Sequence, residues 1–554
     1  MEVKLSGFNY FRYGIVPLGK GYLNSALKQA GHDSRIQLFE DKESIFYDEL
    51  QSVKFFGHEI HDVGVTRYTE RIELTSNTLF GELLNFVDHG DNKLISRYPD
   101  KISAIQKELE GIANSLCKAD VVGFGFLPPA IGVIFYLCKL IKEEDKDIKI
   151  VLGGPITDVL RWVMAPNSYF YEELNGSLIK EGIYGRYVNF LKNNVDYLVH
   201  GEGENTIVEI VNRLEEGDKN PDILGTTTIK DGKIHYNAER PLSEINYISP
   251  PDFSGINLKN YHALSFIFSR GCINACRFCD ETHFWKSYRV RDPQFVLDEL
   301  VDDLNKYHMN YFVACDSLLN GRPKELERLC NHIIDSGIDI NWSGNLRLMQ
   351  TDKKLLQILY KSGYRRAKFG LESLDQSVLN QINKNQTLDH SVEILKVAKE
   401  VGMNVSANLM VGYIGGGVDY EIKMMEKMKK YRPFMDYLSL QSIDIGLRTS
   451  FSRDINCGFK TVSTSSFKEE LWSNYSLAHS YVPGMITYVK NALTRAETDY
   501  IFEMYAKNRL TTSWNLEYLL YTLRLNRLKG MRKYVPIYVK SKLKSYYVKN
   551  QQYI

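Results

Sequence analysis

The chain has 554 residues, of which 44% are hydrophobic and 25% charged, and its formal net charge is +1 at neutral pH. This length suits about two to four domains, and the composition is that of a soluble globular protein rather than a disordered or coiled-coil chain. The balanced charge gives no general case for nucleic-acid binding.

Cysteine usage and the N-terminus predict the compartment. Only 8 cysteines occur, and those outside one short loop are scattered without the regular spacing of a disulfide framework, which is typical of a reducing compartment. The N-terminal residues lack a basic segment followed by an apolar stretch, and the chain has no apolar run of about eighteen residues. We therefore expect a cytoplasmic protein without a transmembrane segment.

Residues 1–240 alternate apolar, strand-like runs with helical patterns, which predicts a parallel α/β sheet. The strand-like runs are Val3–Leu5, Ile36–Phe39, Val121–Phe126, Ile148–Leu152 and Tyr197–Val199. Each of the later runs ends in glycine-rich sequence. Open parallel sheets bind ligands beyond the carboxyl ends of their strands, and glycine lets the backbone approach a ligand closely. A large flat ligand is expected at this edge. NAD and ATP are disfavoured, because no glycine-rich phosphate motif follows the first strand.

After a linker at Pro250-Pro251, a strand-then-helix unit repeats about six times, which predicts an open, partial (β/α)6 barrel. The expected strands are Leu264–Phe268, Tyr311–Ala314, Asp339–Ser343, Arg366–Phe369, Val405–Met410 and Tyr437–Gln441. Barrel enzymes place their chemistry at the carboxyl ends of the strands. The loop after the first expected strand is therefore of special interest.

That loop contains Cys272, Cys276 and Cys279 within Ser-Arg-Gly-Cys-Ile-Asn-Ala-Cys-Arg-Phe-Cys-Asp. A [4Fe–4S] cluster is ordinarily held by four thiolates, so a loop that offers three leaves one iron open to an outside ligand. The alternatives are a structural zinc site and a chance grouping of structural cysteines. Zinc sites usually combine paired C-x2-C or histidine-containing sets with a fourth protein ligand, and the chain has no second pair.

The C-x3-C-x2-C spacing resembles the radical S-adenosylmethionine (SAM) superfamily, in which the open iron chelates the amino and carboxylate groups of SAM. The aromatic residue before the third cysteine also fits the family pattern. The resemblance implies these SAM-binding residues: Phe278, Asp316, Ser317, Glu372, Ser373, Asn408, Val411 and Gly412. Arg347 and Glu372 could instead pair inside the barrel. The fifth strand departs from the family's usual Gly-x-Pro-Gly-x-Thr, because the chain has Met410-Val-Gly-Tyr-Ile-Gly-Gly-Gly417 there.

The amino-terminal region resembles the cobalamin-binding domain of B12-dependent radical SAM enzymes. The matching motifs are Pro17-Leu-Gly19, Gly153-Gly-Pro155 and Asp196-Tyr-Leu-Val-His-Gly-Glu-Gly-Glu204. The resemblance covers about 1–40 and 119–215, so residues 41–118 are expected to be an insertion. It implies these cobalamin-binding residues: Pro17, Leu18, Gly125, Phe126, Leu127, Gly153, Gly154, Pro155, Gly201, Glu202, Gly203 and Glu204.

No Asp-x-His-x-x-Gly motif is present, which is the signature of proteins that place a histidine on cobalt. His58, His61 and His200 lack that context. By analogy with the family, the Phe126–Leu127 loop would cover the lower face of the cofactor. A Rossmann-like module that has lost its cofactor is the alternative for this region.

Residues 451–554 lose the strand–helix alternation, which predicts a mostly helical region. The family resemblance implies that this region closes the barrel mouth and meets the substrate. The last forty residues contain nine lysines and arginines and one acidic residue, Glu517. This basic amphipathic stretch is either a solvated face or a contact surface for an acidic peptide, a membrane surface or a partner protein. Cys457 is an isolated thiol with no assigned role.

The resemblance implies a cobalamin-binding domain at 1–240, a radical SAM core at 250–450 and a helical domain at 451–554. Its cofactors would be a [4Fe–4S] cluster, SAM and cobalamin, with an electron donor such as flavodoxin or ferredoxin. The expected reaction is methylation of an unactivated carbon of a natural-product intermediate or peptide, through methylcobalamin and a 5′-deoxyadenosyl radical. The alternatives are rearrangement, ring contraction or oxidative cyclisation without net methyl transfer, and a non-catalytic cobalamin sensor or carrier. The sequence does not identify the substrate.

Overall fold

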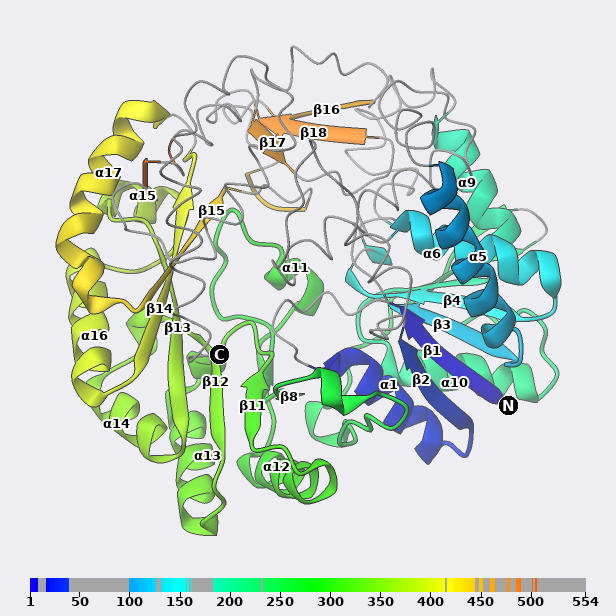
Figure 1. Cartoon of the computed structure of the whole chain (residues 1–554), viewed down its shortest axis with the longest axis horizontal. Coiled ribbons are helices and arrows are strands. Elements are labelled where there is room, and N and C mark those ends of the chain that lie inside the picture. Colours follow the sequence, from blue (N-terminus) through cyan, green and yellow to red (C-terminus); the bar gives the residue numbers. More distant parts are fainter. Residues whose placement is uncertain are drawn as a thin grey trace.

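The computed structural model describes residues 1–7, 16–38, 99–125, 131–155, 157–158, 161, 183–230, 233–413, 416–443 and 448–451. It also describes the short pieces 459–463, 476–478, 485–489, 501 and 504–505. Two mostly parallel sheets with flanking helices stand side by side, and a small third sheet lies above the space between them (Figure 1). The expected α/β fold is therefore confirmed.

The first sheet has the strand order β2-β1-β3-β4-β5-β6-β7. Its parallel strands are β1 (Glu2–Gly7), β2 (Asp33–Leu38), β3 (Val121–Gly125), β4 (Lys149–Gly153) and β5 (Tyr197–Val199). Each of the five overlaps one expected run, and β5 has the expected bounds. An antiparallel hairpin that was not expected, β6 (Thr226–Lys230) and β7 (Lys233–Tyr236), completes the edge.

Helices α1 (Leu18–Gln29), α5 (Pro99–Leu116), α6 (Ile131–Glu144), α9 (Ile183–Asn194) and α10 (Glu204–Glu215) flank this sheet. The α5 helix belongs to the crossover between β2 and β3 and packs beside α6. It falls inside the range 41–118 that was expected to be an insertion. Those residues therefore include one regular crossover helix of the α/β fold.

The carboxyl ends of β1 and β3 come unusually close together. Gly7 has a φ of +130°, and a Cβ there would lie 2.7 Å from the carbonyl oxygen of Gly125. Only glycine therefore suits this end of β1. The close approach occurs at the sheet edge where a ligand was expected.

The second sheet has the order β15-β14-β13-β12-β11-β8, and every neighbouring pair is parallel. Its strands are β8 (Leu264–Phe266), β11 (Tyr311–Ala314), β12 (Asn341–Leu346), β13 (Tyr364–Glu372), β14 (Asn404–Val411) and β15 (Tyr437–Ser442). The connecting helices include α12 (Pro293–Tyr307), α13 (Pro323–Ser336), α14 (Lys353–Lys361), α15 (Gln376–Gln381), α16 (Leu388–Val401) and α17 (Gly417–Tyr431). Each of the six expected runs overlaps one strand.

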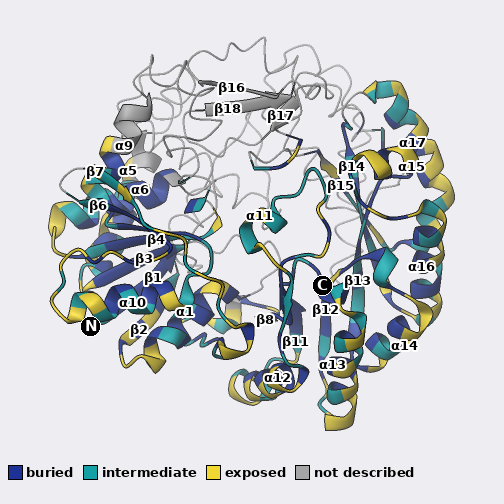
Figure 2. Cartoon of the chain, turned by 180° about the vertical axis from the view of Figure 1, so that it is seen from behind, coloured by how far each residue is buried: buried dark blue, intermediate teal, exposed yellow. Residues whose placement is uncertain are grey.

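The two faces of the second sheet differ in polarity. Side chains facing the helices are apolar and buried, such as Phe369, Ala407 and Leu438, and they form the main core. Buried residues, dark blue in Figure 2, recur along the strands of this sheet. Alternate residues on the other face are polar and only partly buried, such as Lys368 and Asn408. Because strand side chains alternate between faces, this pattern leaves a polar surface on the side away from the helices.

Three of the described pieces of the carboxyl-terminal region are strands rather than the expected helices, whereas residues 501 and 504–505 are helical. β16 (Phe459–Ser463), β17 (Ser476–Ala478) and β18 (Met485–Val489) form a small antiparallel sheet in the order β16-β18-β17. The expectation was wrong for these segments, because runs such as Met-Ile-Thr-Tyr-Val favour strands through their β-branched and aromatic residues. Cys457 and the basic stretch lie outside the described residues.

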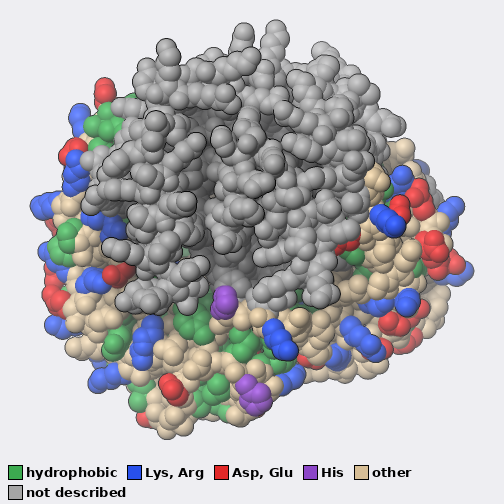
Figure 3. All heavy atoms as spheres, viewed as in Figure 1, with side chains coloured by type: hydrophobic (Ala, Val, Ile, Leu, Met, Phe, Trp, Pro, Cys, Tyr) green, Lys and Arg blue, Asp and Glu red, His purple; other side chains and the backbone are tan. Residues whose placement is uncertain are grey.

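Charged groups of both signs are interspersed over the described surface in the view of Figure 3, in keeping with the balanced composition. None of the helices searched, those of the described residues, has the length and apolar character needed to cross a membrane.

Candidate functional site

The three cysteines lie on one long loop whose two ends are adjacent in space. Two short antiparallel strands, β9 (Ser269–Arg270) and β10 (Arg289–Val290), close its base. The loop ends with helix α11 (Glu281–Trp285). This closed base fixes where the cysteine loop, residues 271–288, begins and ends.

Gly271 is essential to this closure. Its φ is +87°, and a Cβ there would lie 2.4 Å from the carbonyl oxygen of Ser287. A side chain at this position would therefore force the two sides of the base apart. The residue that precedes Cys272 is thus restricted to glycine by the local geometry.

The three thiols are half-buried and none is in a disulfide. Burial raises the pKa of the Cys279 thiol to about 12, and the neighbouring Glu281, Cys276 and Cys272 contribute to that rise. In the part of the chain that was searched, no group of three or more His, Cys, Asp or Glu side chains is arranged around a single metal ion. Three thiols on one loop are the donor set of an iron–sulfur cluster that keeps one iron open.

The cysteine loop is held from one side by the segment that follows α15. The Asn274 side chain donates from Nδ2 to the Cys276 sulfur at 2.9 Å and to the carbonyl oxygen of Asn383 at 2.9 Å. Asn385 donates in turn to Asn274 Oδ1 at 2.8 Å. Asn383 and Asn385 both have positive φ values, which asparagine tolerates better than most residues. These contacts orient the middle of the cysteine loop.

A buried ion pair lies next to this contact. Lys384 Nζ is 2.8 Å from Glu372 Oε1, and the two side chains are 9% and 11% exposed. Burial opposes the charge on Lys384, but the charges of Glu372 and Cys276 hold its pKa above the ordinary value. Arg347 donates to the carbonyl oxygens of Lys384 and Asn385. Glu372, which was expected to bind SAM or to pair with Arg347, is therefore paired with Lys384.

Asp316 binds the residues directly before the cysteine loop. Its buried carboxylate accepts hydrogen bonds from the backbone of Phe268 at 3.0 Å and from the backbone and hydroxyl of Ser269. Burial raises the pKa of Asp316 to about 7. A SAM contact was predicted for this side chain, but its oxygens already hold β9 in place. Asp316 is also only 1% exposed, so a ligand could reach the carboxylate only if this packing opened.

Ser317, also predicted to contact SAM, donates its hydroxyl to Glu281 in α11. Glu281 accepts a second hydrogen bond from Trp285 Nε1 at 2.9 Å. Ser317 therefore links the end of β11 to the helix that follows the third cysteine. Phe278 is half-buried within the cysteine loop itself.

The remaining predicted SAM contacts lie at or after the ends of β13 and β14. Ser373 Oγ is 3.3 Å from the hydroxyl of Tyr420. The Val411 side chain is fully buried in the core, so only its backbone could meet a ligand. The backbone N–H of Gly412 donates to Glu421 at 2.8 Å. Asn408 is half-buried on the polar face of β14, whereas Glu372 and Ser373 are buried.

The predicted cobalamin residues of the first sheet lie along its carboxyl edge. Pro17 and Leu18 begin α1, Gly125 ends β3, and Gly153, Gly154 and Pro155 end and follow β4. Gly201 and Gly203 lie between β5 and α10. Phe126 and Leu127 lie outside the described residues, as do His58 and His61.

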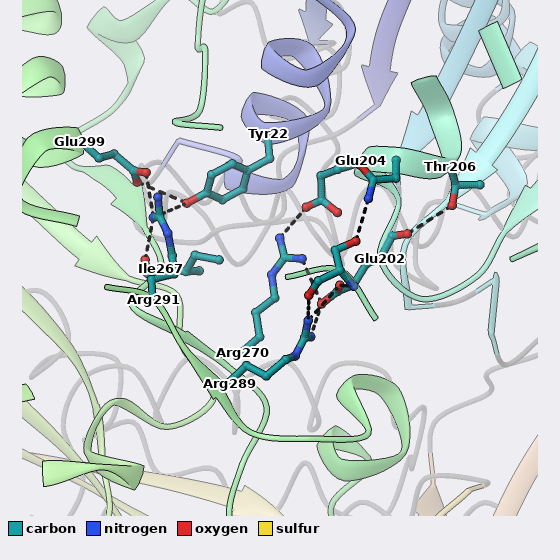
Figure 4. Close-up of polar contacts among 11 residues, drawn as sticks. Tyr22, Glu202, Glu204, Thr206, Ile267, Arg270, Arg289, Arg291 and Glu299 are labelled. Carbon is teal, nitrogen blue, oxygen red and sulfur yellow. Dashed lines mark hydrogen bonds and ion pairs between the residues drawn. The ribbon is translucent and has the colours of Figure 1, made fainter. Parts of the chain in front are cut away.

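Glu202 and Glu204 have a different environment from the one expected of cofactor ligands (Figure 4). Glu202 Oε1 lies 3.1 Å from Arg270, and its other oxygen lies 3.2 Å from Arg289. Glu204 Oε1 pairs with Arg270 as well. Both acids of the glycine-rich loop therefore bind the base of the cysteine loop.

His200 is buried beside the same loop. Its Nε2 is 2.8 Å from Thr227 Oγ1, and its Nδ1 is 3.5 Å from Asp158. Burial lowers the pKa of His200. Asp158 also lies 3.5 Å from Arg448, whose Nε is 2.9 Å from the Asp280 carboxylate. These contacts connect the first sheet to the residue directly after Cys279.

A cavity of about 360 Å³ lies between the carboxyl edge of the first sheet and the cysteine loop. Its lining includes Asp158, His200 and Gly201 from the first sheet, His283 and Phe284 from α11, and Arg448. It therefore opens beside the cysteine loop and at the carboxyl edge of the first sheet. Arg270, Arg289 and Arg448 were not predicted as site residues, because their acidic partners are remote in sequence and no local pattern marks the pairs.

Comparison with known proteins assigns most of the segment that forms the second sheet to a known domain family. Residues 266–428 match the family model of the Radical SAM superfamily, so this segment is a radical SAM domain as predicted. Among curated proteins, the chain is 26% identical over 309 residues to the anaerobic magnesium-protoporphyrin IX monomethyl ester cyclase of Rubrivivax gelatinosus, covering 53% of this chain and 51% of that protein. It is 25% identical over 325 residues to an uncharacterized methyltransferase of Pyrococcus horikoshii, covering 55% and 66%.

Two solved structures share most of the fold. The cobalamin-dependent radical enzyme OxsB, with aqua-cobalamin bound, has a TM-score of 0.60 at 15% identity and covers 100% of this chain and 71% of its own. The radical SAM methyltransferase TsrM from Kitasatospora setae, with cobalamin and a [4Fe-4S] cluster bound, has a TM-score of 0.55 at 13% identity and covers 84% and 78%. The chain thus combines a radical SAM domain with the fold of these two enzymes.

Proposed function

We propose that this chain is a cobalamin-dependent radical SAM enzyme. Cys272, Cys276 and Cys279 would hold a [4Fe–4S] cluster, SAM would occupy its open iron, and cobalamin would lie at the carboxyl edge of the first sheet. One observation supports this above all: the base of the cysteine loop is bound to that edge through Arg270, and the loop itself is bound through Asn274 to the segment that follows α15. We assign the second sheet as an open, partial (β/α)6 barrel, with domains at 1–240, 250–450 and 451–554.

The described residues suit the task of holding reagents and excluding water. When bound, the cluster would supply one electron that cleaves SAM, and cobalamin would carry a methyl group. Asn274 and Asp316 orient the cysteine loop, while Gly412, Ser373 and Asn408 offer backbone and polar groups to SAM. Lys384 neutralises Glu372 and so keeps that buried carboxylate from repelling the carboxylate of SAM.

Two outcomes are compatible with this site. Methylation of an unactivated carbon in a small molecule or peptide is favoured by the methyltransferases among the similar proteins. Cyclisation without net methyl transfer is the second candidate, because a cyclase is also among them. A non-catalytic sensor or carrier would have no need of the intact cysteine triad. We further propose a flavodoxin or ferredoxin as electron donor and a cytoplasmic location, which rests on the scattered free cysteines.

The function is tested by SAM cleavage under strictly anaerobic conditions with dithionite as the reductant. We expect the wild-type protein to convert SAM to 5′-deoxyadenosine and methionine. The triple variant with Cys272, Cys276 and Cys279 replaced by Ala should form neither, yet still bind cobalamin. Cys117→Ala is the matched control, since Cys117 is also half-buried but lies remote from the loop. Unchanged cleavage by the triple variant would exclude the proposed radical chemistry.

A further inference from the structure

The base of the cysteine loop carries three arginines that pair with acids on other elements (Figure 4). Arg270 and Arg289 are directly opposite each other in the β9–β10 pair, and both contact Glu202. Arg270 contacts Glu204 as well. Both acids come from the Gly-Glu-Gly-Glu loop at the end of β5. The cysteine loop is thus joined at its base to the first sheet by two carboxylates and two guanidinium groups.

The third arginine, Arg291, makes a second set of contacts next to the base of the cysteine loop. Arg291 lies 2.8 Å from Glu299 of α12, and it donates to the carbonyl oxygen of Ile267 at 3.1 Å. Tyr22 of α1 donates to the same Glu299 at 3.3 Å. Arg291, directly after β10, also donates to the Tyr22 hydroxyl at 3.4 Å. Helix α1, which flanks the first sheet, therefore contacts the residue next to the base of the cysteine loop.

These ion pairs are buried, which makes them a demanding way to join two domains. The side chains of Arg270 and Glu202 are 5% and 6% exposed. Burial opposes the charge on Glu202, but Arg289 and Arg270 hold its pKa below the ordinary value. Well-packed apolar residues would join the domains at least as stably, whereas ion pairs fix distance and direction. The use of charged groups therefore favours a role in fixing the position of the cysteine loop relative to the first sheet.

Arg270 also reaches into the cysteine loop. Its guanidinium lies over the Trp285 ring of α11, 5.2 Å from the ring centre. Trp285 donates to Glu281, and Glu281 accepts from Ser317. One side chain therefore contacts the edge of the first sheet and the helix that follows the third cysteine.

We propose that Glu202, Glu204 and Arg270 are positioning residues that fix the cysteine loop relative to the carboxyl edge of the first sheet. This inference rests on the proposed function, in which the two cofactors must face a common substrate. The three residues act through the loop and touch no reacting group. Loss of the link should leave each half of the site intact but misplace one half against the other.

The test compares Glu204→Gln with Glu215→Gln. Both substitutions remove one carboxylate from α10, but Glu215 is exposed and pairs with the chain's N-terminal amine. The first measurement is amide hydrogen exchange in protein without cofactors. We expect exchange in residues 271–288 to rise about tenfold in Glu204→Gln, with the core strands unchanged, because a local link has been lost.

The second measurement is the yield of product per 5′-deoxyadenosine in the loaded enzyme. For Glu204→Gln we expect unchanged iron content and deoxyadenosine formation but a yield lowered by about tenfold or more, because misplacement by an ångström is costly. Arg270→Lys keeps the charge but loses the fork that spans two carboxylates, so it should show a smaller loss. If Glu204→Gln fails to fold, Arg270→Lys takes its place in both measurements.

Equal exchange and equal yield in Glu204→Gln and Glu215→Gln would overturn the inference. A rise in exchange spread over the core strands would overturn it too, because that result indicates a general loss of stability. Wild-type protein that neither binds cobalamin nor cleaves SAM would contradict the proposed function. In that case the exchange comparison, made without cofactors, still decides whether Glu204 positions the loop.

Discussion

Gly271→Ala is expected to damage cluster binding more than its size suggests. The residue has a φ of +87°, in the left-handed region, where a side chain costs about 1–2 kcal/mol. The new Cβ would also lie 2.4 Å from the carbonyl oxygen of Ser287, and relieving such overpacking typically costs about 1–3 kcal/mol more. The second cost can be relieved by opening the β9–β10 base, which moves the residue directly before Cys272.

Gly337→Ala is the matched control. Gly337 ends α13 with a φ of +68°, but nothing lies within 4 Å of a Cβ there, so this variant carries the backbone cost alone. The extra cost in Gly271→Ala corresponds to an about 5- to 150-fold smaller population of the binding-competent loop. Iron retained against increasing chelator, after anaerobic reconstitution, measures this difference. The reasoning is refuted if both variants retain iron equally well.

Three further predictions test the electrostatics. Burial raises the pKa of Asp303 to about 8, so the folded protein holds a proton that the unfolded chain loses, and stability should fall as the pH rises from about 4 to about 8. Asp303→Asn should remove this dependence and raise the melting temperature most above pH 8; a variant no more stable than wild type at pH 9 would contradict this. Lys384→Met leaves Glu372 buried without its partner and should destabilise the protein by about 3–5 kcal/mol, with part regained on adding Glu372→Gln. Denaturant unfolding of the two variants measures both effects, and no recovery in the double variant would count against the pairing. Glu421→Gln weakens the acceptor that holds the Gly412 backbone and should raise KM for SAM more than it lowers kcat; a fall in kcat alone would disagree.

The strands were predictable where their signal is local. Tyr197–Val199 was predicted to the residue, because a short apolar run between polar segments is typical of a buried parallel strand. The β6–β7 hairpin was missed, although its two strands flank an Asp-Gly pair, a strong hairpin signal. The prediction followed alternation of strands and helices and therefore passed over an antiparallel addition.

The site was predictable only as far as its members are neighbours in sequence. The cysteines share one short loop, so their spacing alone indicated the ligand set. Arg270 and Glu204 are 66 positions apart, and no periodicity connects them. Glu202 and Glu204 were predicted as cofactor ligands because the motif Asp196–Glu204 resembles that of the cobalamin-binding family. That pattern gives their place in the chain but not which neighbour their charge meets after the domains pack.

The central claim is that one chain holds both an iron–sulfur cluster and cobalamin. The most direct test is the iron and cobalt content, with the optical spectrum, of protein purified without oxygen from cells supplied with cobalamin. We predict about four irons and about one cobalamin per chain. About four irons without cobalamin would contradict the account, because the first sheet would then lack the cofactor on which the proposed chemistry depends.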